Sequence, residues 1–123
     1  EATPELQGKW AEHFRWLLED WKFVPAGRIL AAAGMHALDH HVERLAEDHA
    51  HARTLAEACG VDPADVDTNI VVFERPDAAD FVVRARDAGV LISAVGPRTV
   101  RLVTHLDVTA DDARRAAQVL QGL

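Results

Sequence analysis

The first hydrophobic pattern in the chain is helical. Apolar residues recur every three or four positions near the amino-terminal end, which is the spacing of one face of an α-helix. They are Leu6, Trp10, Phe14, Leu17 and Trp21. Thr3-Pro4-Glu5 fits a helix start, because a hydroxyl cap precedes a proline at the first helical position. The pattern predicts a helix from about 4 to 21. Trp16 and Leu18 lie off its apolar face, as in helices that take part in interfaces.

A second, longer helix is expected from about 27 to 59, after Pro25 and Gly27 interrupt the pattern. Its apolar positions are Ile29, Leu30, Ala33, Leu38, Val42, Leu45, Ala52, Leu55 and Cys59. Gly34 is unfavourable inside a helix, so it predicts a kink or a close approach by another backbone. Gly60 is suited to end the helix in a left-handed conformation.

Beyond Gly60 the period changes to that of short strands, and glycine or proline bounds most segments. The predicted elements are a strand over 68–73, a helix from Asp77 to about 88, strands over 90–95 and 99–103, and a helix from a capping box at Thr109–Asp112 to about 120. The order is α-α-β-α-β-β-α. This order predicts an α+β fold, in which two amino-terminal helices pack on a small, mostly antiparallel three-stranded sheet.

Composition narrows the function classes. The 123 residues suit one domain with an appendage, and the formal net charge is −7. An acidic chain is poorly suited to bind nucleic acid or an anionic membrane. Cys59 is the only cysteine, so no internal disulfide is expected. With no signal pattern at Glu1–Pro4 and no long apolar run, we expect a cytoplasmic protein.

Histidines in the second helix are the first candidates for chemistry. His36 and His40 stand four residues apart, which suits two metal ligands on one helix face. A third ligand is not evident, because His41 points about 100° away on a helix. The two readings are a metal site at His36 and His40 or a set of solvated surface histidines, and the missing third ligand favours the second.

Arg101 is the second candidate, since it lies between two apolar residues of a predicted strand. The strand period places it on the face opposite its neighbours. It is either a solvent-side arginine or a receptor for a carboxylate, which a guanidinium binds with two hydrogen bonds. His105 and Asp107 follow this strand, and Ser93 lies in the neighbouring one. No nucleophile turn surrounds that serine, so structural hydrogen bonding is favoured over a catalytic triad.

Several segments together resemble one enzyme family. They are 26–27, 30–34, 37–41, 44–50, 68–71, 89–91 and 101–108, which read AG, LAAAG, ALDHH, RLAEDHA, TNIV, GVL and RLVTHLDV. In this order, and with Ser93, they are similar to the carboxyl-terminal small domain of threonine aldolases. The resemblance covers about 27–123.

This resemblance implies the type I fold of pyridoxal-phosphate enzymes and cleavage of β-hydroxy amino acids such as threonine. It also implies that Arg101 occupies the position at which the family holds the substrate carboxylate. The family's Schiff-base lysine lies in a large domain that precedes the long helix. Here only 26 residues precede it, and the two lysines, Lys9 and Lys22, lie in an aromatic helix and its exit. We therefore expect no catalytic residue and no cofactor in this chain.

Residues 10–34 are also similar to an amino-terminal segment of adenosylcobalamin-dependent ribonucleotide reductases, on the strength of FRW at 14–16 and WKFVPAGRI at 21–29. This second resemblance implies a chimera, natural or engineered. It divides the chain into an aromatic helix with a hinge at 1–26 and an aldolase-like small domain at 27–123.

Three hypotheses follow. The leading one is a non-catalytic folded fragment or chimera derived from the small domain of a threonine aldolase. The alternatives are a partial aldolase that acts only with its large domain, and a histidine-based metal-binding module. We also expect a homodimer, because the first helix is apolar on several sides. Its predicted interface comprises Trp10, Phe14, Trp16, Leu17, Leu18 and Trp21.

Overall fold

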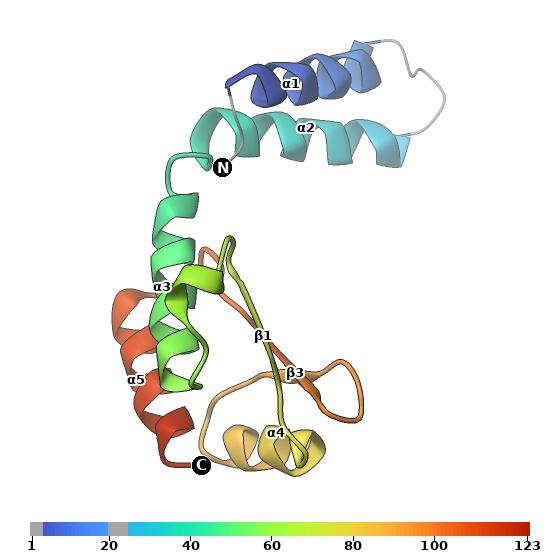
Figure 1. Ribbon diagram of the computed structural model, residues 1–123. Helices are drawn as coiled ribbons and strands as arrows, with labels where there is room; N and C mark the ends of the chain where they lie inside the picture. The colour runs from blue at the N-terminus through green and yellow to red at the C-terminus, as the bar shows by residue number, and fades with distance from the viewer. Residues whose placement is uncertain (1–3, 20–24) are drawn as a thin grey trace. The chain divides into compact units, whose positions relative to one another are not determined.

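A computed structural model describes residues 4–19 and 25–123 of the chain, and the side chains of residues 8–16 and 29–123 (Figure 1). The chain divides into two compact units, Glu1–Arg44 and Leu45–Leu123, which are called unit 1 and unit 2 below. Each unit is described by itself. No helix within the described ranges is long and apolar enough to cross a membrane.

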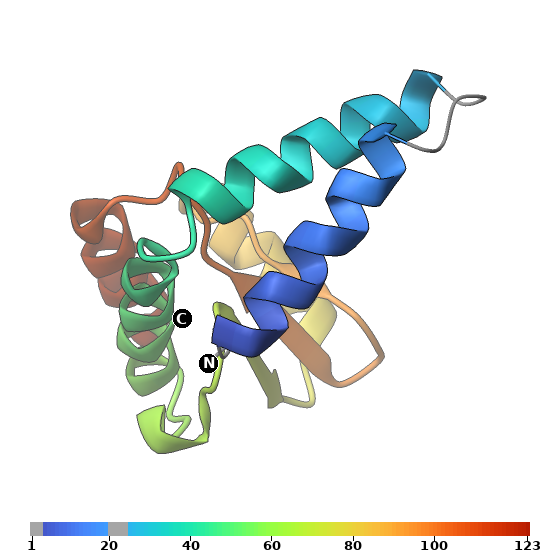
Figure 2. The ribbon, with the colours of Figure 1, turned by 90° about the horizontal axis from the view of Figure 1, so that it is seen from above.

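Unit 1 consists of two helices, α1 (Pro4–Glu19) and α2 (Pro25–His40), which lie side by side. Seen from above, their axes cross at an angle (Figure 2). The helices approach closely at Gly34, where an added Cβ would lie 2.7 Å from the Cε1 and Cζ atoms of Phe14. Gly34 thus marks a close approach, as the sequence predicted, but an aromatic ring makes the contact instead of another backbone.

The prediction of a single long helix over about 27–59 is wrong. Residues 41–44 form a turn, and α3 (Leu45–Ala58) begins after it. The turn contains no glycine or proline, so the sequence carried no strong stop signal. His40, His41 and Val42 are all weaker helix formers than the alanines and leucines on either side, so this stretch supports a continuous helix less well than its flanks.

Unit 2 is an α+β fold, as predicted. After α3 and a short 3₁₀ turn, η1 (Pro63–Asp65), come β1 (Ile70–Glu74), α4 (Ala78–Asp87), β2 (Ser93–Ala94), β3 (Thr99–Val103) and α5 (Ala110–Gln121). The three strands form one antiparallel sheet in the order β1-β3-β2. The element order is the expected one, apart from the division of the second helix and the added η1.

The core of unit 2 lies on one face of this sheet. Val71, Val100 and Leu102 point inward, and each is at most 3% exposed. They share one cluster with residues of α3, α4 and α5, and the largest buried side chain among them is Phe81. Figure 1 shows α3 and α5 lying together along the same side of the strands. This arrangement leaves the other sheet face without a covering helix from unit 2.

The predicted strand over 90–95 is reduced to the two residues of β2. The amide of Val90 donates to the carbonyl of Ala85 at 2.8 Å, and so it completes the end of α4. Gly89 adopts a φ of +86°, the left-handed conformation that this helix ending requires. Ladder pairing with β3 therefore starts only at Ser93.

Two other predicted helix boundaries are confirmed. Gly60 follows α3 with a φ of +74°. Thr109 and Asp112 form a reciprocal capping box at the start of α5, in which each side chain accepts a hydrogen bond from the backbone amide of the other. Hydrogen bonds from the Thr109 side chain and backbone hold the pKa of Asp112 below its ordinary value.

Candidate functional site

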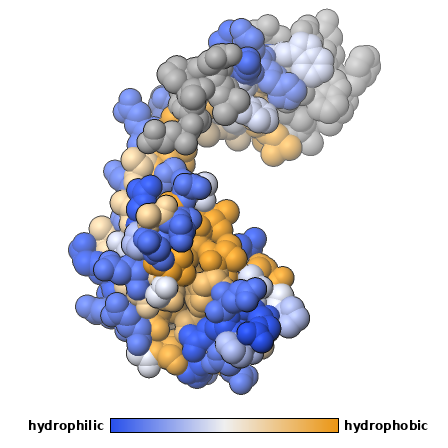
Figure 3. Space-filling view, in the orientation of Figure 1, coloured by the Kyte–Doolittle hydropathy of each residue, from blue (hydrophilic) through white to orange (hydrophobic). Residues whose placement is uncertain are grey.

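Arg101 lies in the middle of β3, on the sheet face that no helix of unit 2 covers. Its direct neighbours across the sheet are Val72 of β1 and Ser93 of β2. Ile70, Val72 and Val103 surround it on this open face and are 41–53% exposed. In Figure 3, apolar atoms (orange) are visible over the strands of unit 2. The open face is thus an apolar surface with one guanidinium at its centre.

The guanidinium of Arg101 is available for a ligand. No residue in the described part of the chain forms an ion pair or a side-chain hydrogen bond with it. Two other arginines near the sheet, Arg75 and Arg84, both bind the carboxylate of Asp77, at 2.7 and 2.8 Å. Those two bonds contribute to holding the pKa of Asp77 below its ordinary value, and the Arg75 hydrogen bond is the largest cause. An exposed, uncommitted arginine on a rigid strand is suited to bind an anion.

A buried set of hydrogen bonds fixes the end of the strand that carries Arg101. Thr104 is 1% exposed, and its hydroxyl donates to the carbonyl of Asp48 in α3 at 2.6 Å. Its amide donates to the carbonyl of Asn69 at 3.0 Å, and the Asn69 side-chain amide donates back to the Thr104 carbonyl at 2.6 Å. These bonds tie β3 to the start of β1 and to the first turn of α3. The sequence analysis favoured structural hydrogen bonding over catalysis at this strand end, and these bonds confirm the structural hydrogen bonding.

The same strand end provides no catalytic triad. The His105 Nδ1 atom accepts a hydrogen bond from the Asp107 amide at 3.3 Å and lies 3.6 Å from an Asp107 carboxylate oxygen. The Ser93 hydroxyl donates to the carbonyl of Arg101, at 3.4 Å, and not to an imidazole. Burial raises the pKa of the Cys59 thiol, although the nearby Arg75 acts in the opposite direction. None of these groups is arranged as an activated nucleophile.

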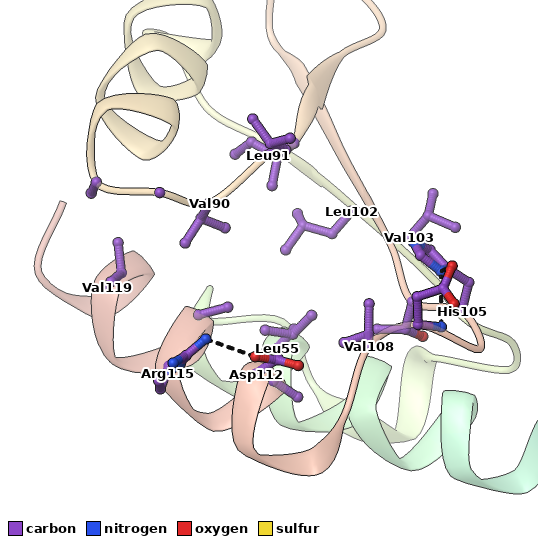
Figure 4. A pocket seen from close by; sticks show the side chains of 17 residues that line it. Leu55, Val90, Leu91, Leu102, Val103, His105, Val108, Asp112, Arg115 and Val119 are labelled. Carbon is purple, nitrogen blue, oxygen red and sulfur yellow. Dashed lines mark hydrogen bonds and ion pairs between the residues drawn. The ribbon is translucent and has the colours of Figure 1, made fainter.

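A groove of about 600 Å³ opens between the segment that follows α4, the end of β3 and α5 (Figure 4). Its walls are mainly apolar, with Val90 and Leu91 on one side and Val119 and Leu55 on the other. The sequence analysis missed this groove. Its walls come from segments more than 60 residues apart, and no local pattern signals that they meet.

The polar groups at the edge of the groove are largely committed to structural contacts. Arg115 binds Asp112 at 2.7 Å, and Asp112 also serves the cap of α5. Asp107 is the other acid at this edge, and its side chain is 86% exposed. The groove can therefore hold an apolar group, and the paired His105 and Asp107 side chains lie at its edge.

The lysines of the chain do not form a cofactor site in the described residues. Lys9 is exposed on α1, in unit 1. Lys22 lies outside the described residues. A lysine that holds pyridoxal phosphate needs a pocket around it, and the groove in unit 2 has no lysine among its lining residues.

Three histidines meet at the end of α2. The ring centroids of His36 and His40 are 4.5 Å apart, and those of His36 and His41 are 5.3 Å apart. His36 and His40 are exposed. Within residues 4–19 and 25–123, no three or more metal-ligating side chains are grouped to hold an ion. The two readings of His36 and His40, a metal site and a pair of solvated surface histidines, therefore both stay predictions, and the second stays the favoured one.

The predicted interface on α1 is only partly described. Trp10 and Trp16 are each 51% exposed, whereas Phe14 is half-buried against Gly34. The side chains of Leu17 and Leu18, and all of Trp21, lie outside the described residues. Among the described residues of this predicted interface, Trp10 and Trp16 are therefore the two with exposed side chains.

Comparison with known proteins shows which enzymes the chain is similar to. No protein-family model matches the chain. The low specificity L-threonine aldolases of Escherichia coli O157:H7 and of strain K12 are 44% and 43% identical to it over 96 residues. Most of this chain is threonine aldolase-like. A probable low-specificity L-threonine aldolase of Arabidopsis thaliana is 32% identical over 95 residues.

The threonine aldolase similarity is partial in both directions. The match to the first Escherichia coli enzyme covers 72% of this chain and 28% of that enzyme. The chain thus spans little more than a quarter of the length of the curated relatives it matches. The resemblance to threonine aldolases is confirmed at this level. The resemblance of residues 10–34 to ribonucleotide reductases, the chimera and the division into 1–26 and 27–123 stay predictions.

Proposed function

We propose that residues 27–123 act as the small domain of a pyridoxal-phosphate-dependent threonine aldolase, and that the 123 residues alone are not catalytic. The observation that carries this proposal is the 44% identity to a threonine aldolase over a stretch that makes up 28% of that enzyme. The open sheet face agrees with it. This face presents apolar side chains and an uncommitted arginine, which together suit a surface that closes one side of an active site.

In this role Arg101 binds the carboxylate of the amino-acid substrate. A guanidinium grips a carboxylate through two parallel hydrogen bonds, which fixes the orientation of the substrate as well as its position. The bonds that Thr104 makes to Asp48 and Asn69 hold β3 in place, so the arginine is presented from a rigid strand.

Pyridoxal phosphate, when bound, supplies the electron sink that permits cleavage of the carbon–carbon bond. The residues of this chain supply substrate orientation on one side of that site. The lysine for the cofactor must come from residues outside unit 2, because unit 2 contains no lysine. We therefore assign the chain a binding role within a larger enzyme.

A segment exchange tests the proposal. The matched stretch of about 96 residues in the Escherichia coli enzyme is replaced by the corresponding stretch of this chain. We expect the hybrid to bind pyridoxal phosphate and to cleave threonine. Replacing Arg101 with alanine should raise the KM for threonine and lower kcat/KM by at least about 100-fold, since a bidentate charged contact is lost.

The matched control is Arg98→Ala, which removes an exposed arginine from the same hairpin. This variant should keep kcat/KM within about threefold of the hybrid, because surface substitutions have small effects. A hybrid that binds the cofactor but does not cleave threonine would contradict the proposal. Equal losses in the Arg98 and Arg101 variants would contradict the role of Arg101.

We also propose that the chain forms a homodimer through α1. The exposure of Trp10 and Trp16 supports this, since two half-exposed tryptophans on one helix are typical of a contact surface. Sedimentation at micromolar concentration should show about twice the 13.5 kDa mass of one chain. The Trp16→Glu variant should sediment as a monomer. A parent protein that already sediments at 13.5 kDa would contradict the proposal.

A further inference from the structure

We propose that His36 and His40 form an exchangeable binding site for a late first-row divalent ion such as Ni²⁺ or Cu²⁺. Both imidazoles are exposed near the end of α2, and their ring centroids are 4.5 Å apart. The site lies within unit 1 and is independent of the aldolase-like sheet in unit 2.

The helix itself brings the two rings together. Residues four apart lie on the same helix face, with Cβ atoms about 5–6 Å from each other. Two imidazole nitrogens that share one ion, each about 2.0–2.1 Å from it, lie roughly 3 Å apart. Rings whose centroids are 4.5 Å apart can reach this geometry by side-chain rotation alone.

The ring nitrogens are available to an ion. No described residue forms a hydrogen bond or an ion pair with the imidazoles of His36 and His40. Neutral imidazole is a ligand for nickel, copper and zinc, and it is a poor one for magnesium or calcium, which prefer oxygen. The usual order of affinities places copper and nickel above cobalt at such a nitrogen site.

The position within the helix also favours a cation. His40 is the last residue of α2, where the aligned peptide dipoles give the helix a partial negative charge. The protein as a whole carries a formal net charge of −7, so a positive ion approaches an acidic molecule. Local and overall electrostatics therefore act in the same direction.

The site holds an ion weakly and exchangeably. Since the described residues offer no group of three or more ligands, water fills the remaining coordination positions. Structural zinc sites use four protein ligands, and this site has two. We therefore expect an ion that binds when it is added and leaves on dialysis. A bound ion bridges one turn of α2 and so stabilises that turn.

Calorimetric titration of the whole chain with Ni²⁺ at pH 7.5 tests the site. We expect a single saturable site. His36→Ala and His40→Ala should each weaken binding at least about tenfold, because one of two ligands is lost. His41→Ala and His49→Ala are the matched controls, and each should leave the affinity within about threefold of the parent. His41 contacts His36 without being a proposed ligand, and His49 lies in α3.

Circular dichroism of each variant before the titration separates loss of ligand from loss of fold. Saturable binding that disappears only in the His36 and His40 variants, with helix content unchanged, supports the site. An absence of saturable binding in the parent overturns the proposal. So does an affinity that His36→Ala does not change. A loss in His41→Ala as large as in His36→Ala overturns the two-ligand assignment.

Discussion

Unit 1 and unit 2 are stabilised in different ways. In unit 2, elements spread over nearly 80 residues share one core, and Phe81, Val71 and Val100 are each at most 1% exposed. In unit 1, two helices pack on each other, and among its described side chains only Ala31 is a buried hydrophobic residue. Unit 2 therefore has the contacts of a domain that folds by itself. In unit 1, the described side chains contribute a much smaller buried set than those of unit 2.

The comparison also separates two kinds of chemistry. Unit 2 presents a guanidinium on a strand that buried hydrogen bonds hold at its end. Unit 1 presents exposed imidazoles and tryptophans on its two helices. Substrate orientation requires a rigid support, and the proposed aldolase-like role is therefore assigned to unit 2. Exchangeable metal binding and self-association are less demanding and suit unit 1.

The largest effect is expected from Phe81→Ala, which removes the largest buried side chain of unit 2. We expect the free energy of unfolding of unit 2 to fall by about 3–5 kcal/mol, since the change combines lost apolar burial with a cavity. Urea denaturation followed by far-ultraviolet circular dichroism measures it. The matched change in unit 1, Trp16→Ala, should cost less than about 1 kcal/mol in the monomer because Trp16 is half exposed. Equal costs would contradict the contrast between the units.

The second effect concerns the bonds that fix β3. Thr104→Val keeps the shape of the side chain but removes the hydroxyl that donates to the Asp48 carbonyl. We expect a loss of about 0.5–1.5 kcal/mol in the stability of unit 2, because the buried hydrogen bond between β3 and α3 is lost. Amide hydrogen exchange should show faster exchange at the end of β3 and little change in α4. Unchanged exchange in β3 would show that Thr104 does not fix this strand.

The third effect tests the packing in unit 1. Gly34→Ala places a methyl group 2.7 Å from the Phe14 ring, so the ring has to move and the packing between α1 and α2 is disturbed. Alanine also favours the helix by about 1 kcal/mol. We expect the clash to outweigh the higher helix propensity of alanine. The thermal stability of unit 1 should therefore fall, and the tryptophan emission should shift toward that of tryptophans on helices that no longer pack on each other.

Two control variants sharpen this third test. Gly8→Ala introduces a methyl group that meets nothing within 4 Å, so it should only stabilise α1. In a Phe14→Leu background, Gly34→Ala should become stabilising, since the ring is gone. A Gly34→Ala variant that is more stable than the parent with Phe14 present would contradict the observed packing.

The smallest effect is the acid dependence of unit 2. The pKa values of Asp77 and Asp112 are lowered in the folded state, chiefly by hydrogen bonds from Arg75 and Thr109 respectively. Their contribution to stability is therefore present above the ordinary carboxyl pKa and is lost as the pH falls through the lowered value. The double variant Asp77→Asn/Asp112→Asn should show a flatter decline in urea midpoint below about pH 4. A decline as steep as in the parent would exclude these two groups as its cause.

Local signals in the sequence predicted much of unit 2. The alternation around Arg101 correctly predicted its exposed face, and the capping box at Thr109 and Gly60 each marked a helix end. These features depend on neighbouring residues only. The turn at 41–44 was missed because it has no glycine or proline. The prediction that residues 90–92 belong to a strand was wrong, because the Val90 amide completes α4 instead of pairing with β3.

Features that depend on distant residues were not predictable in this way. The groove walls come from Leu55, Val90 and Val119, and the bond from Thr104 reaches a carbonyl 56 positions earlier. The sequence nevertheless carried the residues of that bond, since Asp48, Asn69 and Thr104 all lie in the aldolase-like segments. The neighbours of Arg101 on the open face could not be predicted, because only the strand register places Val72 and Ser93 beside it.

The most direct test of the central claim is an absorbance titration of the 123-residue chain with pyridoxal phosphate, together with an assay for glycine released from threonine. The account predicts that no covalent lysine adduct forms and that no glycine appears, because unit 2 contains no lysine and Lys9 is exposed on α1. An adduct band that disappears in the Lys9→Ala or Lys22→Ala variant, accompanied by glycine formation, would contradict the account.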